Sequence, residues 1–273
     1  MIPSQPYAPV SPEYVEGRSV LCYNDVAQTS GATLTASATA AQSGTTTFVA
    51  ANAFDGLTYD YWAPGASGAQ SLQIDLPAPA AVDFFALAAH NCGSLAGSLQ
   101  LQGSLNGSTW VNILPEGSFT PASDATLVRL FPQVVYPHYK MIFNSASAAL
   151  KIGILMIGLS TPMQRGVRVG HQPAPYARKV IFSTQQAESG QFLGRSIQRV
   201  SNDIAIDLKN LSDRWYRQML EPFILSAETR PFAFVWDKWL YPGEAFFGYL
   251  TQRPIPTESK SLLDVQMQAT GIA

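Results

Sequence analysis

The chain has 273 residues, of which 47% are hydrophobic and only 13% are charged, and its formal net charge is -2. A sequence-specific nucleic-acid binder would show a basic stripe and a high pI, so this composition excludes that class. No apolar run approaches the roughly 20 residues that a membrane span needs. The low charged fraction instead indicates β-rich domains, or large surfaces that are buried in an assembly.

Two features of the first hundred residues bear on organisation. Residues 1–17 contain four prolines and predict an arm that becomes ordered only against a partner. Cys22 and Cys92 leave two interpretations open, a disulfide or two buried thiols. They cannot form a structural zinc site by themselves, and the three histidines lie far apart in the sequence.

From residue 18 to 160 the predicted elements are short strands separated by Gly, Pro, Asn and Ser turns. This spacing is typical of a β-sandwich or jelly roll. Asn106-Gly107 predicts a tight type I′ hairpin, because both residues tolerate positive φ. The strand candidates in chain order are ATLTASATA, SLQIDL, VDFFALAAH, SLQLQGS, ATLVRLF, YKMIFN and IGILMIGL.

Charge divides the chain near residue 160. Four of the 17 Lys and Arg residues lie between residues 18 and 160, and the other 13 follow. The segment 161–178 is rich in Pro, Gly and Arg and predicts an extended linker. We therefore expect an arm at 1–17, a jelly roll at 18–160, a linker at 161–178 and a second domain at 179–273.

The second domain has the predicted element order β-β-α-β-β-β. Its helix, at about 213–226, places Trp215, Met219 and Phe223 at helical spacing after a capping segment that ends at Ser212. Pro222 should kink or end this helix unless a new turn begins there. The expected fold class is thus all-β: a jelly roll followed by a barrel or sheet with one packed helix.

The segments NAFDGLTYDYW, SLQIDL and SLNGSTW resemble, in this order, the galactose-binding-like jelly roll of discoidin (F5/8 type C) domains. In this family the A-F-D-G turn often surrounds a structural calcium ion, which implies ligands among Asp55, Thr58 and Asp60. The alternative is that Asp55 caps its own turn, Gly56 supplies positive φ, and no ion is bound. Phe54, Trp62 and Trp110 are expected to be core residues.

Sugar recognition in the family uses loop aromatics together with polar side chains, which implies a candidate site at Tyr59, Tyr61, His90 and Asn91. An alternative for His90 and Asn91 is that they form an ordinary turn. We expect no cofactor apart from the candidate calcium ion. The sequence lacks nucleophile, zinc-protease and phosphate-loop motifs, so no enzymatic activity is expected.

The second half is similar in element order to the distal tail and baseplate ring proteins of bacteriophages. This resemblance implies a homo-oligomeric ring, a hexamer, between the tail tube protein and a baseplate hub. The expected location is the virion tail tip, after synthesis in the host cytoplasm, since residues 1–17 lack signal-peptide features. The alternative function is a carbohydrate-binding adhesion module or a glycan-cleaving tail protein.

Overall fold

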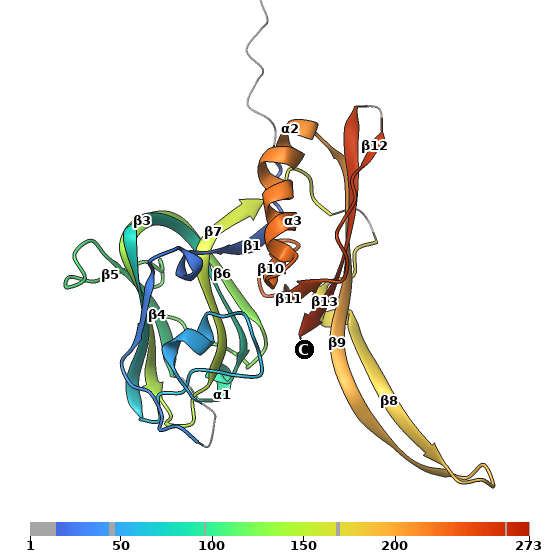
Figure 1. Ribbon diagram of the computed structural model, residues 1–273, viewed down its shortest axis with the longest axis horizontal. Helices are drawn as coiled ribbons and strands as arrows, with labels where there is room; N and C mark the ends of the chain where they lie inside the picture. The colour runs from blue at the N-terminus through green and yellow to red at the C-terminus, as the bar shows by residue number, and fades with distance from the viewer. Residues whose placement is uncertain (1–14, 44–46, 96, 168–169, 260, 273) are drawn as a thin grey trace, which may run out of the picture.

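The computed structural model describes residues 15–43, 47–95, 97–167, 170–259 and 261–272. Within them the protein is all-β, as predicted: one sheet runs through both halves in the order β5-β4-β6-β3-β7-β1-β10-β11-β13-β9-β8, with β2 on β3 and β12 on β13 (Figure 1). No helix in the described residues is long and apolar enough to cross a membrane. Most of the predicted arm, residues 1–14, lies outside the described residues.

The first half is a jelly roll with short helical turns in the connections between its strands. Its strands are β1 (Val20–Asp25), β2 (Thr33–Ala36), β3 (Gly68–His90), β4 (Ser98–Ser104), β5 (Val111–Asn112), β6 (Leu127–Ala146) and β7 (Ile152–Pro162). Its helical turns are η1 (Val26–Gln28), η2 (Ala50–Ala53) and α1 (Cys92–Leu95).

Two long strands, β3 and β6, bend and so contribute to both layers of the jelly roll. The pairing of β3 with β6 shifts register between Asp75 and Ala80, where Pro77 and Pro79 cannot donate to the ladder. Tyr139 holds this bend, since its hydroxyl donates to the carbonyl of Ala80 at 2.5 Å. Beyond the bend, β3 pairs with β7 as well as with β6.

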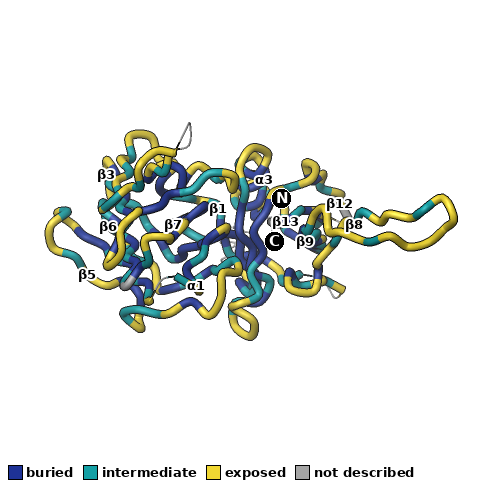
Figure 2. The backbone as a smooth tube through the Cα atoms, turned by 90° about the horizontal axis from the view of Figure 1, so that it is seen from below, coloured by how far each residue is buried: buried dark blue, intermediate teal, exposed yellow. Residues whose placement is uncertain are grey.

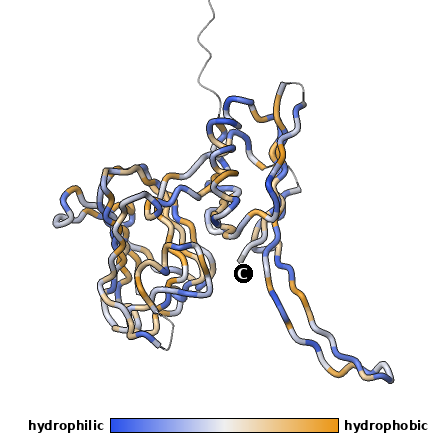
Figure 3. Tube along the Cα trace, viewed as in Figure 1, coloured by the Kyte–Doolittle hydropathy of each residue, from blue (hydrophilic) through white to orange (hydrophobic). Residues whose placement is uncertain are grey.

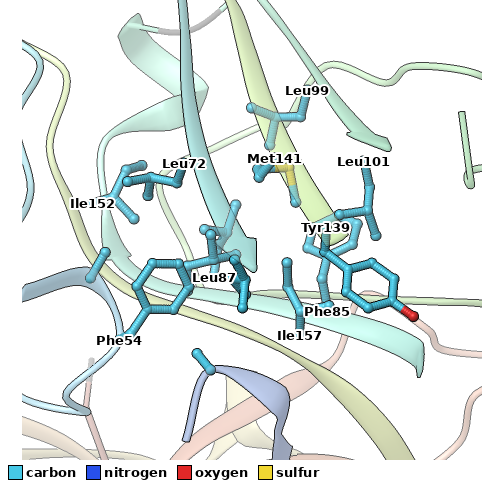
Figure 4. Close-up of a cluster of buried hydrophobic side chains, with 14 of the residues drawn as sticks. Phe54, Leu72, Phe85, Leu87, Leu99, Leu101, Tyr139, Met141, Ile152 and Ile157 are labelled. Carbon is cyan, nitrogen blue, oxygen red and sulfur yellow. The ribbon is translucent and has the colours of Figure 1, made fainter. Parts of the chain in front are cut away.

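The core of the jelly roll comes from the alternation of its strands. Leu72, Ile74, Tyr139 and Met141 point inward and are at most 1% exposed, because every second side chain of a strand faces the same side. Figure 4 shows such residues from β3, β4, β6 and β7 packed against one another. The intervening residues of β3 and β6 therefore face outward.

The second half combines strands with one helical segment. Its strands are β8 (Arg178–Gln186), β9 (Phe192–Leu211), β10 (Phe232–Val235), β11 (Ala245–Leu250), β12 (Thr257–Ser259) and β13 (Leu262–Ile272), and its short turn is η3 (Ala174–Tyr176). The helical segment comprises α2 (Asp213–Trp215), a π-type turn η4 (Tyr216–Leu220) and α3 (Glu221–Ala227). Its bounds confirm the predicted helix.

Two local features explain how this helix begins and continues. The hydroxyl of Ser212 accepts from the backbone N–H of Trp215 at 3.2 Å, which is the predicted N-cap. Pro222 does not end the helix, because it lies in the first turn of α3, directly after the π-type turn, where the missing backbone N–H is tolerated. Trp215 and Phe223 are buried against the strands of the second half.

The two halves meet at strand β1. Val20 pairs with Pro162 of β7 on one side and with Val235 of β10 on the other, so the sheet is continuous across the junction. Figure 2 shows this region as buried backbone. A shared apolar cluster lies on it, and its buried members are Val20, Cys22, Phe84, Ala86, Ala88, Val128, Ile154, Met156, Ala233, Val235 and Phe247. The two halves on either side of the predicted linker, residues 161–178, therefore both pair with strand β1 and both contribute to one apolar cluster.

Candidate functional site

The A-F-D-G turn lies where the jelly roll touches the second half. Oδ1 of Asp55 accepts from the backbone N–H of Leu57 at 2.8 Å, and Gly56 has φ +82°. A Cβ on Gly56 would lie 3.0 Å from Cδ of Pro231. The turn therefore has the geometry that was predicted from Asp-Gly, and it also forms part of the contact between the halves.

Beside this turn, the side chains of Asp55 and Asp60 contact each other. Burial raises the pKa of Asp55, and the neighbouring Asp60 carboxyl raises it further. The hydrogen bond from the backbone of Leu57 lowers this pKa but does not cancel the rise. Oδ1 of Asp60 is buried without a hydrogen-bond partner among the described residues. Two carboxylates with an unpaired oxygen fit a calcium ion, which takes six to eight oxygen ligands.

The remaining calcium ligands would have to be backbone carbonyls, hydroxyls or water. In the part of the chain that the structure describes, no group of three or more His, Cys, Asp or Glu side chains could hold a metal ion. Thr58 is exposed and lies between Asp55 and Asp60 in the sequence, so its hydroxyl and its backbone carbonyl are further candidate oxygen ligands. Asp55, Thr58 and Asp60 thus stay the candidate ligands.

A second group of side chains lies in the loops of the jelly roll, and we call it the loop cluster: Phe48, Tyr61, Asn91 and Lys151, together with Tyr59, which lies two residues before Tyr61 in the chain. The ring of Tyr61 packs on Phe48, with centroids 5.1 Å apart, and Nζ of Lys151 lies 4.6 Å from the Tyr61 centroid. Oδ1 of Asn91 accepts from the backbone N–H of Lys151 at 2.7 Å. Tyr59 is 81% exposed. The fold therefore joins Tyr61 and Asn91 through Lys151, which the sequence did not single out.

His90 lies inside the fold instead. Its side chain is 7% exposed, and Nδ1 accepts from the backbone N–H of Cys92 at 3.2 Å at the start of α1. Burial lowers the pKa of His90. A buried imidazole that accepts a backbone hydrogen bond orders this turn, so His90 is not part of the loop cluster. Cys22 and Cys92 are both free and buried.

Trp110 was predicted to be a core residue, and this prediction is wrong. Its ring lies over Nζ of Lys140 at 3.7 Å, on the outward face of β6, and is only partly buried. The tight Asn106-Gly107 turn is also not formed. Oδ1 of Asn106 instead accepts from the backbone of Ser108 and Thr109 at 2.9 and 2.8 Å, and only Gly107 has positive φ. The resulting longer loop carries Trp110 over the sheet.

In the second half, β8 and the start of β9 form a two-stranded arm, residues 178–200. The arm projects from the body (Figure 1) and is exposed along most of its length (Figure 2). Figure 3 shows hydrophobic and hydrophilic residues mixed along it. Its exposed apolar side chains are Ile181, Phe182, Phe192, Leu193 and Ile197. Since β8 is the last strand in the sheet order, its outer edge is unpaired within the described chain.

Comparison with known proteins finds a family match in the first half. Residues 33–151 match the family model of the F5/8 type C domain. No curated protein matched the sequence. The matched range runs from β2 to the residue before β7 and so lies within the jelly roll.

Several solved structures are similar to part of this chain. One is a Clostridium perfringens protein in complex with GalNAc-β-1,3-galactose, at 18% identity over 46% of this chain and 94% of that chain, with a TM-score of 0.40. Another is a pectin-binding carbohydrate-binding module, at 20% identity over 46% and 88%, with a TM-score of 0.38. A Ruminococcus gnavus fucosidase in complex with fucose has 15% identity over 50% and 27%, with a TM-score of 0.41.

Proposed function

We propose that this chain is a non-catalytic glycan-binding protein, whose F5/8 type C jelly roll holds a sugar at the loop cluster. The observation that supports this is the pairing of Tyr61 with Lys151, together with the exposed Tyr59 two residues earlier in the same loop. Aromatic rings offer a flat apolar surface for the C–H face of a sugar ring. A neighbouring ammonium and amide supply hydrogen bonds to hydroxyls.

The loop cluster is held in place by its own hydrogen bonds. Asn91 accepts from Lys151 and donates through Nδ2 to the carbonyl of Ala149 at 3.0 Å, so it fixes the loop that carries Lys151. Asn52 donates to the carbonyl of Tyr61 at 3.3 Å and is buried. A site whose side chains are ordered before the ligand arrives loses less conformational entropy on binding.

A glycan array probed with the labelled full-length chain tests this proposal. Tyr59→Ala and Tyr61→Ala should weaken binding by about tenfold, because each removes a stacking surface. Tyr176→Ala is the matched control, since Tyr176 is an exposed tyrosine of the second half. If no glycan is bound, or if all three variants bind like the parent, the loop site is refuted. Release of reducing ends from a bound glycan would contradict the non-catalytic role.

The second half supports a second role, attachment of the glycan-binding domain to an assembly. An isolated two-stranded arm is at best marginally stable in water, and an unpaired edge with apolar side chains invites pairing with another chain. We propose that copies of this chain form a homo-oligomeric ring, a hexamer, between a tail tube protein and a baseplate hub at a bacteriophage tail tip. The resemblance of the second half to distal tail proteins motivates this setting.

The ring is tested by the mass and symmetry of the protein in assembled particles. Electron microscopy of virions should show six copies around the tail axis. A lone copy without rotational symmetry, or absence from the tail tip, would refute the ring while leaving the glycan-binding proposal untouched. Arg214 and Arg217, which lie outward on the helix, are the predicted contacts to a neighbouring subunit.

A further inference from the structure

A second polar surface lies on the outward face of the jelly roll, on elements other than the loop cluster. The side chains at successive paired positions of five adjacent strands line up there. Thr35 of β2 pairs with Gln73 of β3, Gln73 with Lys140 of β6, Lys140 with Gln102 of β4, and Gln102 with Asn112 of β5. Gln73, Lys140 and Gln102 point away from the core, because they alternate with buried residues, and Thr35 and Asn112 are themselves exposed.

A parallel row runs beside the first. Thr33 pairs with Asp75, Asp75 with His138, and His138 with Ser104. Nδ1 of His138 lies 2.6 Å from Oδ1 of Asp75. A Cβ on Gly107 would lie 3.7 Å from Nε2 of His138, so the loop before Trp110 folds over this row.

Hydrogen bonds between these side chains fix their orientation. Nε2 of Gln73 donates to both carboxylate oxygens of Asp75, at 2.9 and 3.0 Å. Nε2 of Gln102 donates to Oδ1 of Asn112 at 3.0 Å. A primary amide has two donors and an acceptor with two lone pairs, so each of these groups retains capacity for a ligand. The side chains of the two rows are therefore held in place but still have donors and acceptors free for a ligand.

Trp110 supplies the aromatic surface of this face. Its ring lies over Lys140 at 3.7 Å and remains partly exposed. We define the Trp110 face by its residues: Gln73, Asp75, Gln102, Trp110, Asn112, His138 and Lys140. Its charges balance, since Asp75 and Lys140 carry opposite signs. An aromatic ring beside aligned amides and one carboxylate matches the alternating apolar and hydroxyl surfaces of a neutral sugar chain.

We propose that the Trp110 face is a second glycan-binding site, which takes a neutral oligosaccharide laid across the strands. Neighbouring strands lie about 4.8 Å apart, so the row from β2 to β5 extends over roughly 19 Å. That length holds a short chain of sugar rings and exceeds a single ring. The inference goes beyond the loop cluster, because it uses neither the residues nor the loops of that site.

Isothermal titration of the full-length chain with neutral tetrasaccharides, built from glucose, galactose or N-acetylglucosamine, tests the proposal. A tetrasaccharide should bind about tenfold more tightly than its monosaccharide, and Trp110→Ala should remove about tenfold in affinity. Gln73→Ala gives an independent variant on an outward position of the same row. Trp239→Ala is the matched control, because Trp239 is an exposed tryptophan of the second half.

The outcomes separate this site from the loop cluster. Loss of affinity in Trp110→Ala and Gln73→Ala, with Tyr61→Ala and Trp239→Ala unchanged, supports the Trp110 face. Loss only in Tyr61→Ala overturns it and leaves the proposed function standing. Binding of none of the tetrasaccharides, or of uronic-acid oligosaccharides alone, also overturns it. Thermal melts of both face variants show whether a lost affinity comes from a lost fold.

Discussion

Gly56 and Pro231 meet where the two halves of the chain touch, and a side chain on Gly56 would press against the proline ring. A Cβ on Gly56 would lie 3.0 Å from Cδ of Pro231, and the backbone of Gly56 has φ +82°. The turn that marks the jelly roll in the sequence is thus also a contact to the second half.

Gly56→Ala should lower the free energy of unfolding for two reasons. Positive φ costs a residue with a Cβ about 1–2 kcal/mol, and the contact with Pro231 adds to this cost. Gly68→Ala is the control, since Gly68 has φ +104° but nothing within 4 Å of the added Cβ. Urea unfolding of both variants isolates the contact. If both variants lose the same free energy of unfolding, the contact with Pro231 contributes nothing to the effect of Gly56→Ala.

Calcium should stabilise the protein if Asp55 and Asp60 hold it. A ligand that binds only the folded state raises the melting temperature, so millimolar calcium should raise it and a chelator should reverse the rise. Asp60→Asn should abolish the response. Asp213→Asn, at an exposed carboxylate of the helix, should retain it. If the melting temperature is the same with calcium and with chelator, no calcium ion stabilises this turn.

Asp25 should make stability depend on pH. Its carboxyl is enclosed at the junction, and burial raises its pKa to about 7 despite bonds from the backbone of Ala27 and Ile157. Since the folded state then holds a proton that the unfolded state releases near pH 4, stability should fall as the pH rises from about 4 to 7 and level off above.

Asp25→Asn should flatten this dependence, because asparagine can accept the same backbone bonds without titrating. The measurement is the free energy of unfolding of both proteins across this pH range. Asp213→Asn should keep the slope of the parent. If the free energies of unfolding of the parent and of Asp25→Asn change with pH in parallel, the pH dependence comes from a group other than Asp25.

The two-stranded arm of residues 178–200 should be cut by a glutamate-specific protease at Glu188, in the exposed turn between β8 and β9. Isolated subunits should be cleaved there first, and Glu188→Gln should prevent it. In assembled particles the site should be protected, if the arm pairs with a neighbour. Equal cleavage of free and assembled protein would show that the arm stays solvent-exposed in the assembly.

Several local features follow from the sequence alone. The alternation of Leu72 and Ile74 placed these residues in the core, and the helical spacing of Trp215 and Phe223 placed the helix and its buried side. Asp55-Gly56 predicted its turn, because positive φ and a self-capping carboxylate are properties of the two residues themselves. Each of these depends on neighbours only a few positions away.

Other features depended on which distant segments pair. Trp110 was expected in the core, but the loop capped by Asn106 carries it onto the outer face, where Lys140 from β6 lies beneath it. His90 was expected in a sugar site, but the end of β3 turns it inward to cap α1. Alternation shows which residues of one strand share a face, but the register between strands decides which of them become neighbours. That register depends on long-range pairing and on the bends at prolines, so the rows of the Trp110 face, and the sharing of β1 by both halves, were settled by the tertiary structure alone.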